Sequence, residues 1–174
     1  MSRTRAWIYA TAVALAVIIA DQVSKEMIEN RLVLGERVEV LGPLELTHVG
    51  NAGIAFGLGS GGGALIVIGA LAALAVIGIL FARDPTRQGL WLAIGLLAGG
   101  AIGNLIDRIE NKAVTDFIKL PLWPSFNIAD IAITFGVLGL AWAIIRDGHR
   151  EAGAGAGAVD GDAVADGKAD RHGG

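Results

Sequence analysis

Residues 99–130, GGAIGNLIDRIENKAVTDFIKLPLWPSFNIAD, decide the fold of this chain, because they place acids on the borders of two apolar segments. Three carboxylates lie in this stretch, at Asp107, Asp116 and Asp130. An acid that borders hydrocarbon is energetically costly, and it is a functional hypothesis by default. A fourth acid, Asp21, ends an apolar segment near the start of the chain. We interpret the rest of the sequence as the scaffold that brings these four carboxylates together.

The composition points to a membrane protein. Of the 174 residues, 53% are hydrophobic and only 18% are charged, which is outside the usual range for a soluble domain. Charged side chains are absent from four windows, which are residues 6–20, 46–82, 88–106 and 131–145. These windows predict four membrane-spanning helices, at about 6–26, 63–82, 89–108 and 128–146.

The segment between the first two predicted helices, at about 31–60, has a different pattern. RVEVLG and LELTHV alternate apolar and polar residues, which predicts short strands with one face against the membrane or the helices. The predicted fold is therefore an all-α membrane protein of four transmembrane helices, with short strands between helices 1 and 2. Residues 1–150 form one membrane domain, and the Gly- and Ala-rich residues 151–174 are expected to be a disordered cytoplasmic tail.

Basic residues set the orientation that we expect. Arg3 and Arg5 precede the first helix, and Arg83 and Arg87 lie in the short loop after the second. The positive-inside rule then puts both termini in the cytoplasm and all four acids on the outer side of the membrane. Only 15 uncharged residues separate Arg5 from Asp21, about 22 Å of helix against a hydrocarbon core of about 30 Å. Asp21 is therefore expected below the outer surface.

Several polar residues at the membrane border share a helical face with one of the acids. Asp21 lies four residues before Lys25, and Asn104 lies three and four residues before Asp107 and Arg108. The plain interpretation is that these groups cap helices and hold loops, and that Asp21 and Lys25 satisfy each other. We expect this structural role for them.

Asp116 and Asp130 differ, because Asp116 lies in an apolar run without an adjacent base, and Asp130 has no nearby cation in the sequence. Two poorly compensated carboxylates at one membrane level suggest a pair that shares a proton, with one base and one acid near neutral pH. Such a pair can activate water for amide hydrolysis. Two other functions stay open from the residues alone. The acids could form a relay in a small transporter or proton channel, or they could bind partners in a structural assembly factor.

Other chemistry finds little support in the sequence. The absence of cysteine excludes disulfides, thiolate nucleophiles and zinc–sulfur sites. No cluster has the spacing of metal ligands, and nucleic-acid binding would need a concentrated basic face. Ser24 and Lys25 are adjacent on a helix, which is the wrong geometry for a Ser–Lys dyad, and His48 is expected to be a surface residue of a strand.

Five short motifs resemble, in order, those of the lipoprotein signal peptidases, which are aspartyl peptidases of the bacterial inner membrane. The motifs are DQVSK (21–25), NAGIAFG (51–57), GNLIDR (103–108), VTDF (114–117) and FNIAD (126–130). Ile54 stands where the family commonly has alanine, and Ile131 stands where a hydroxyl residue often follows the second aspartate.

The resemblance implies four transmembrane helices with a small outer-side β-cradle between helices 1 and 2. It also implies an endopeptidase that cleaves prolipoproteins immediately before a diacylglyceryl-modified cysteine. It implies no cofactor and no metal, and membrane lipids and the prolipoprotein substrate are the partners, with no obligate protein partner and no nucleic acid. The catalytic pair would be Asp116 and Asp130. The residues expected to bind substrate or support the site are Asp21, Lys25, Asn51, Gly53, Asn104, Asp107, Arg108 and Asn127.

Overall fold

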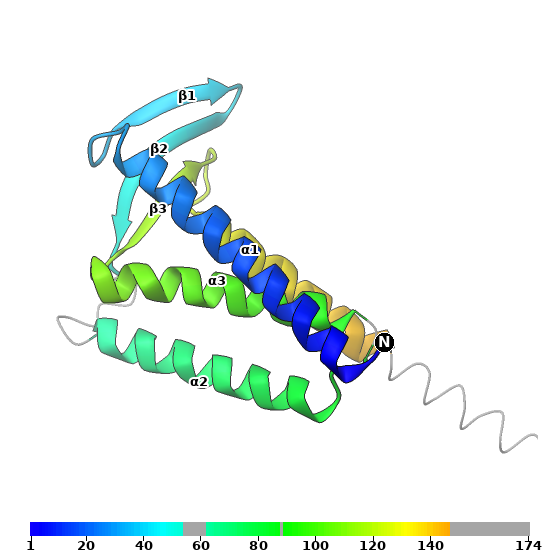
Figure 1. The fold of residues 1–174 in the computed structure, drawn as a ribbon. Coiled ribbons are helices and arrows are strands. Elements are labelled where there is room, and N and C mark those ends of the chain that lie inside the picture. The colour runs from blue at the N-terminus through cyan, green and yellow to red at the C-terminus, as the bar shows by residue number, and fades with distance from the viewer. Residues whose placement is uncertain (54–61, 88, 147–174) are drawn as a thin grey trace, which may run out of the picture.

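The computed structural model describes residues 1–53, 62–87 and 89–146, and these residues form a bundle of helices with a small sheet at one end (Figure 1). The predicted tail at 151–174 and the second half of the NAGIAFG motif, residues 54–57, lie outside the described residues. In chain order the elements are α1 (Arg3–Glu29), β1 (Arg37–Leu41), β2 (Leu44–Asn51), α2 (Gly62–Arg83), α3 (Leu90–Glu110) and β3 (Val114–Lys119), followed by a C-terminal helix, Ile128–Arg146.

Three of the helices are long and apolar enough to cross a membrane: α1, α3 and the C-terminal helix. α2 is also apolar, but its portion Ile68–Arg83 is shorter than these three helices. The described residues therefore establish three candidate spans and a mostly helical fold. The fourth span stays a prediction.

The sheet has three antiparallel strands in the order β1-β2-β3, and its third strand comes from a part of the chain that the prediction did not include. The predicted β-structure lay wholly between the first two helices, but β3 follows α3. It pairs with β2 so that Val49 lies opposite Asp116. A short apolar strand can form here because β2 offers it a free edge. This pairing positions Asp116 beside the end of β2.

Small residues bring the helices close together, and α3 contacts the other three helices. A Cβ atom at Gly99 would lie 2.8 Å from the Ala14 carbonyl oxygen of α1 and 2.8 Å from Val17 Cβ. At Gly103, the same atom would lie 2.7 Å from Asp21 Oδ2. Gly95, Gly99 and Gly103, spaced four residues apart on α3, therefore form a smooth ridge against α1.

We expect Gly99→Ala to destabilise the protein by about 1–3 kcal/mol, because a methyl group would push α1 away from α3. The matched control is Gly78→Ala on α2, where a Cβ atom meets nothing within 4 Å. Alanine is the better helix former, so the control should melt at the parent temperature or above it. Thermal unfolding in detergent measures both variants, and equal melting temperatures would contradict this description of the packing.

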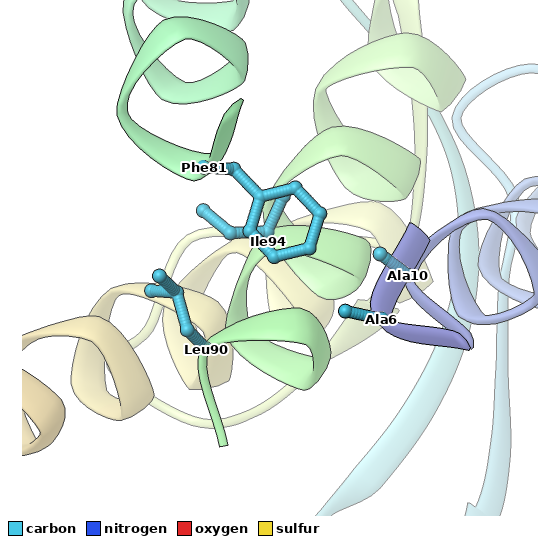
Figure 2. Packing of buried hydrophobic residues seen from close by; sticks show 5 residues of the cluster. All are labelled: Ala6, Ala10, Phe81, Leu90 and Ile94. Carbon is cyan, nitrogen blue, oxygen red and sulfur yellow. The ribbon is translucent and has the colours of Figure 1, made fainter. Parts of the chain in front are cut away.

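The apolar core lies at the end of the bundle away from the sheet. Ala6, Ala10, Phe81, Leu90 and Ile94 are buried together, from α1, α2 and α3, and Figure 2 shows their packing. Trp7 adds an edge-on contact to Phe81, with ring centroids 4.7 Å apart. The other end of the bundle contains a different kind of interior, which is polar.

Candidate active site

The buried polar side chains of the described residues gather where the helices meet the sheet. They come from the end of α1, the end of α3, strands β2 and β3, and the start of the C-terminal helix. These residues are Asp21, Lys25, Thr47, Asn104, Asp107, Thr115, Asp116 and Asn127. Asp130 is half-buried beside them. The three acids of the stretch 99–130 and Asp21 thus meet in one region of the structure.

Lys25 is the only basic residue among the buried polar side chains of the described part of the chain. Its Nζ atom lies 2.7 Å from Asp21 Oδ2 and 2.7 Å from Asp107 Oδ2, and it donates to Asn104 Oδ1 at 3.2 Å. An ammonium group has three donors, so these partners satisfy it fully. The expected contact between Asp21 and Lys25 is present, and Asp107 joins it from α3.

Asp21 also connects α1 to the C-terminal helix, because its Oδ1 accepts a hydrogen bond from the Ala129 amide at 2.9 Å. Gln22 makes a second connection that the sequence analysis missed. Its Nε2 donates to Asp107 Oδ1 at 2.8 Å and to the Gly103 carbonyl oxygen at 3.2 Å. Its place in DQVSK, next to an acid at the membrane border, is the feature of the sequence that could have indicated this role.

Asn127 and Asp130 hold the start of the C-terminal helix in a reciprocal capping arrangement. The Asp130 amide donates to Asn127 Oδ1 at 2.9 Å, and the Asn127 amide donates to Asp130 Oδ2 at 3.3 Å. Asn104 Nδ2 donates to the other carboxylate oxygen of Asp130 at 2.8 Å. The local sequence FNIAD thereby fixes the orientation of this carboxylate.

Asp116 is held by two amide side chains. Asn127 Nδ2 donates to Asp116 Oδ1 at 2.9 Å, and Asn51 Nδ2 donates to Asp116 Oδ2 at 3.0 Å. Asn51 is in turn held by the Gly53 amide, which donates to its Oδ1 at 2.9 Å. Gly53 has a positive φ of 72°, a backbone conformation that favours glycine. Asn51 and Gly53, both from the NAGIAFG motif, therefore help to fix the position of Asp116.

The acids of the cluster therefore divide into two kinds. Asp21 and Asp107 form ion pairs with Lys25, whereas Asp116 and Asp130 have only uncharged hydrogen-bond donors among the described residues. Burial raises the pKa of Asp116 from 3.8 to about 6; the hydrogen bond from Asn51 opposes this, and the nearby charge of Asp130 adds to it. The charge of Lys25 also lowers this pKa, but without a direct contact. Two nearby carboxylates that lack a direct ion pair can hold one proton between them.

The raised pKa of Asp116 predicts a pH-dependent stability. Between its ordinary value of 3.8 and about 6, the folded state binds more protons than the unfolded state, so the free energy of unfolding falls as the pH rises. Asp116→Asn removes this titration. We expect the melting temperature of the parent, relative to that of the variant, to fall between about pH 4 and about pH 7. A difference that is independent of pH would show that Asp116 titrates at its ordinary value.

Thr115 is a second residue that the sequence analysis did not single out. Its amide donates to Asp107 Oδ2 at 3.2 Å, its Oγ1 donates to Glu29 of α1, and its carbonyl oxygen accepts from Asn127 Nδ2 at 3.3 Å. Residues of α1 and α3 and the residue before the C-terminal helix thus hold Thr115, which precedes Asp116. Its place in the VTDF motif is the feature of the sequence that could have indicated this role.

Arg108 does not pair with its neighbour Asp107. Its Nη1 instead donates to the Asn104 carbonyl oxygen of its own helix at 3.1 Å. Ser24 donates to the Asp21 carbonyl oxygen, and His48 Nδ1 lies 2.9 Å from the Leu32 carbonyl oxygen. Within the described ranges, no group of three His, Asp or Glu residues is arranged to hold a metal ion.

The fold and the cluster define a class: an α-helical membrane protein with its acids gathered at one end of the helices. A model of the signal peptidase (SPase) II family matches residues 13–146. The lipoprotein signal peptidase of Moorella thermoacetica is 41% identical over 134 residues, which cover 76% of this chain and 89% of that protein. The protein of the same name from Syntrophomonas wolfei is 42% identical over 138 residues, covering 79% and 93%.

A solved structure of a bacterial membrane enzyme, determined by the in meso method at 1.9 Å resolution, is similar as well. It has 34% sequence identity and a TM-score of 0.74, and the match covers 79% of this chain and 93% of that one. The chain belongs to the signal peptidase II family.

Proposed function

We propose that this chain is a membrane aspartyl endopeptidase that removes signal peptides from prolipoproteins, by cleaving the bond before a diacylglyceryl-modified cysteine. Membership of the signal peptidase II family supports the activity and the substrate class. The observation that carries the aspartyl mechanism is the contrast between the two kinds of acid. Lys25 forms ion pairs with Asp21 and Asp107, whereas among the described residues only amide groups donate to Asp116 and Asp130.

In the proposed reaction, a water molecule lies between Asp116 and Asp130. Because burial favours the protonated form of Asp116, we assign the resting proton to Asp116 and the role of base to Asp130, which is more exposed. Asp130 takes a proton from the water, whose oxygen attacks the carbonyl carbon of the scissile bond. Asp116 gives its proton to the departing nitrogen as the C–N bond breaks. The products are a new carboxylate on the signal peptide and a free amine on the modified cysteine.

The other buried polar residues serve as support in this proposal. Asn127 contacts both members of the pair, and Asn104 connects Asp130 to the charged group around Lys25. Their hydrogen bonds fix the two carboxylates before substrate arrives, which is the condition for effective acid–base catalysis. No metal or organic cofactor has a role in the proposed steps.

Basic residues support a location for the site on the outer side of the inner membrane. Arg3 and Arg87 lie at the end of the bundle away from the sheet, where Arg3 donates to the Ala82 carbonyl oxygen and Arg87 donates to that of Ala143. If that end faces the cytoplasm, as the positive-inside rule predicts, both termini are cytoplasmic and the acids face the periplasm. This orientation also needs α2 to be the fourth span.

The transporter alternative gains no support from the described residues. A relay across the membrane needs polar groups at both ends of the bundle, but the buried polar side chains described here lie at the sheet end. The opposite end contains the apolar cluster of Figure 2.

Incubation of the purified protein with a diacylglyceryl-modified prolipoprotein, followed by mass analysis, tests the function. We expect two products, which separate at the bond before the modified cysteine. The matched control is the same prolipoprotein without its lipid, which we expect to remain intact. Cleavage at another bond, or equal cleavage of the unlipidated control, would overturn the proposal.

A further inference from the structure

A cavity lies between the end of α1 and the sheet, and the proposed reaction does not use it. Its volume is about 360 Å³, which lies within the range of about 300–1,000 Å³ that is usual for ligand sites. The end of α1, the following loop and one residue from each strand contribute to it. The lining residues are Ser24, Met27, Ile28, Arg31, Leu32, Val38, Leu46 and Phe117.

This cavity is separate from the aspartate pair. Successive side chains of a strand point to opposite faces, so Phe117 and Asp116 face different sides of β3. Phe117 lines the cavity, and Asp116 is turned toward Asn51 and Asn127. A peptide bond held at the aspartates would therefore lie across the sheet from the cavity.

The lining indicates a ligand with a hydrocarbon body. Six of the eight lining residues are apolar, and the hydroxyl of Ser24 already donates to the Asp21 carbonyl oxygen. Apart from Arg31, no side chain on the lining offers a free polar group to bind a sugar or a peptide backbone. A flexible hydrocarbon chain needs no such group, because burial of its surface supplies the favourable free energy.

Arg31 indicates the chemistry of the ligand's head group. Arg31 is exposed, and its guanidinium forms no ion pair with a carboxylate of the described residues. A guanidinium group matches the geometry of phosphate with two parallel hydrogen bonds. The ligand that combines a hydrocarbon chain with a phosphate at its head is a phospholipid.

The position of the cavity favours the same ligand. α1 is long and apolar enough to cross a membrane, and the cavity lies at the end of this helix. Met27 and Val38 on its lining are 47% and 42% exposed, so apolar surface continues from the cavity to the outside of the protein. We propose that this cavity binds one acyl chain of a bilayer glycerophospholipid with an anionic head, and that Arg31 binds the phosphate.

A bound acyl chain would contact α1 and all three strands together. It would therefore stabilise the attachment of the sheet, and with it the position of β3, without touching the aspartates. Ligand that binds only the folded state raises the melting temperature as its concentration increases. The stabilisation by lipid is thus a direct measure of the site.

The test is the melting temperature of the full-length protein in detergent, titrated with phosphatidylglycerol. We expect Arg31→Gln to raise the half-saturating mole fraction of phosphatidylglycerol by about tenfold, the effect of one charge-assisted contact. Arg37→Gln is the matched control, because Arg37 is also exposed and does not line the cavity. It should respond to lipid like the parent.

Two further arms keep the test decisive. Leu46→Trp fills the cavity and should lose the response to lipid. If this variant does not fold, Val38→Phe takes its place, and the same loss is expected. Diacylglycerol, which has the chains without the phosphate, should stabilise the parent much less than phosphatidylglycerol does. Equal responses of the parent and Arg31→Gln, or equal stabilisation by the two lipids, would overturn the proposal. Neither result depends on peptidase activity.

Discussion

Purified Asp116→Asn and Asp130→Asn variants are expected to cleave a lipidated prolipoprotein at least about a hundredfold more slowly than the parent, the smallest usual contribution of an acid–base group. The amide has nearly the size of the carboxyl group, but it can neither accept the proton of the attacking water nor donate one to the leaving nitrogen. Mass analysis of the products over time measures the rates.

The matched control for these variants is Asp84→Asn, because Asp84 is exposed and lies beyond the end of α2. It should keep the parent rate. Thermal unfolding must show that the Asp116 and Asp130 variants are folded, since both side chains accept hydrogen bonds that position the site. A folded variant of either aspartate that works at nearly the parent rate would remove that residue from the mechanism.

The Lys25→Met variant is expected to lose about 3–5 kcal/mol of stability, because it leaves Asp21 and Asp107 buried without a cation. The matched control is Lys112→Met, since Lys112 is exposed. Chemical or thermal unfolding in detergent measures both variants. We expect the control to stay close to the parent.

A double variant makes this prediction sharper. Asp107→Asn should destabilise the parent, but in the Lys25→Met background it removes an unpaired buried charge and should restore part of the loss. Additive effects of the two substitutions would mean that Lys25 and Asp107 do not stabilise each other in the folded protein.

Much of the fold could be predicted because the hydrocarbon core of a membrane imposes a simple rule on the sequence. Long windows without charge predicted apolar helices, and the described helices α1, α3 and Ile128–Arg146 lie on three of them. The contact between Asp21 and Lys25 followed from their spacing of four residues. Both inferences concern residues that are close in the sequence.

The features that could not be predicted depend on contacts between residues that are far apart in the sequence. Nothing in the sequence says that Asp107 would be the second partner of Lys25, because that contact exists only where α3 lies against α1 through glycines such as Gly99. The pairing of β3 with β2 joins residues that are far apart in the chain, so the third strand was missed. Gln22 and Thr115 were missed for the same reason, since Gln22 donates to Asp107 and Thr115 donates to Glu29, which lie 85 and 86 residues away in the chain.

The dependence of kcat/KM on pH, measured between about pH 4 and about pH 9 with lipidated prolipoprotein, tests the shared proton most directly. The pair can work only while one carboxyl group is protonated and the other is ionised. The account predicts a bell-shaped profile, which falls at low pH where both Asp116 and Asp130 are protonated and at high pH where neither is. A rate that stays constant, or that only rises across this range in a protein that remains folded, would contradict it.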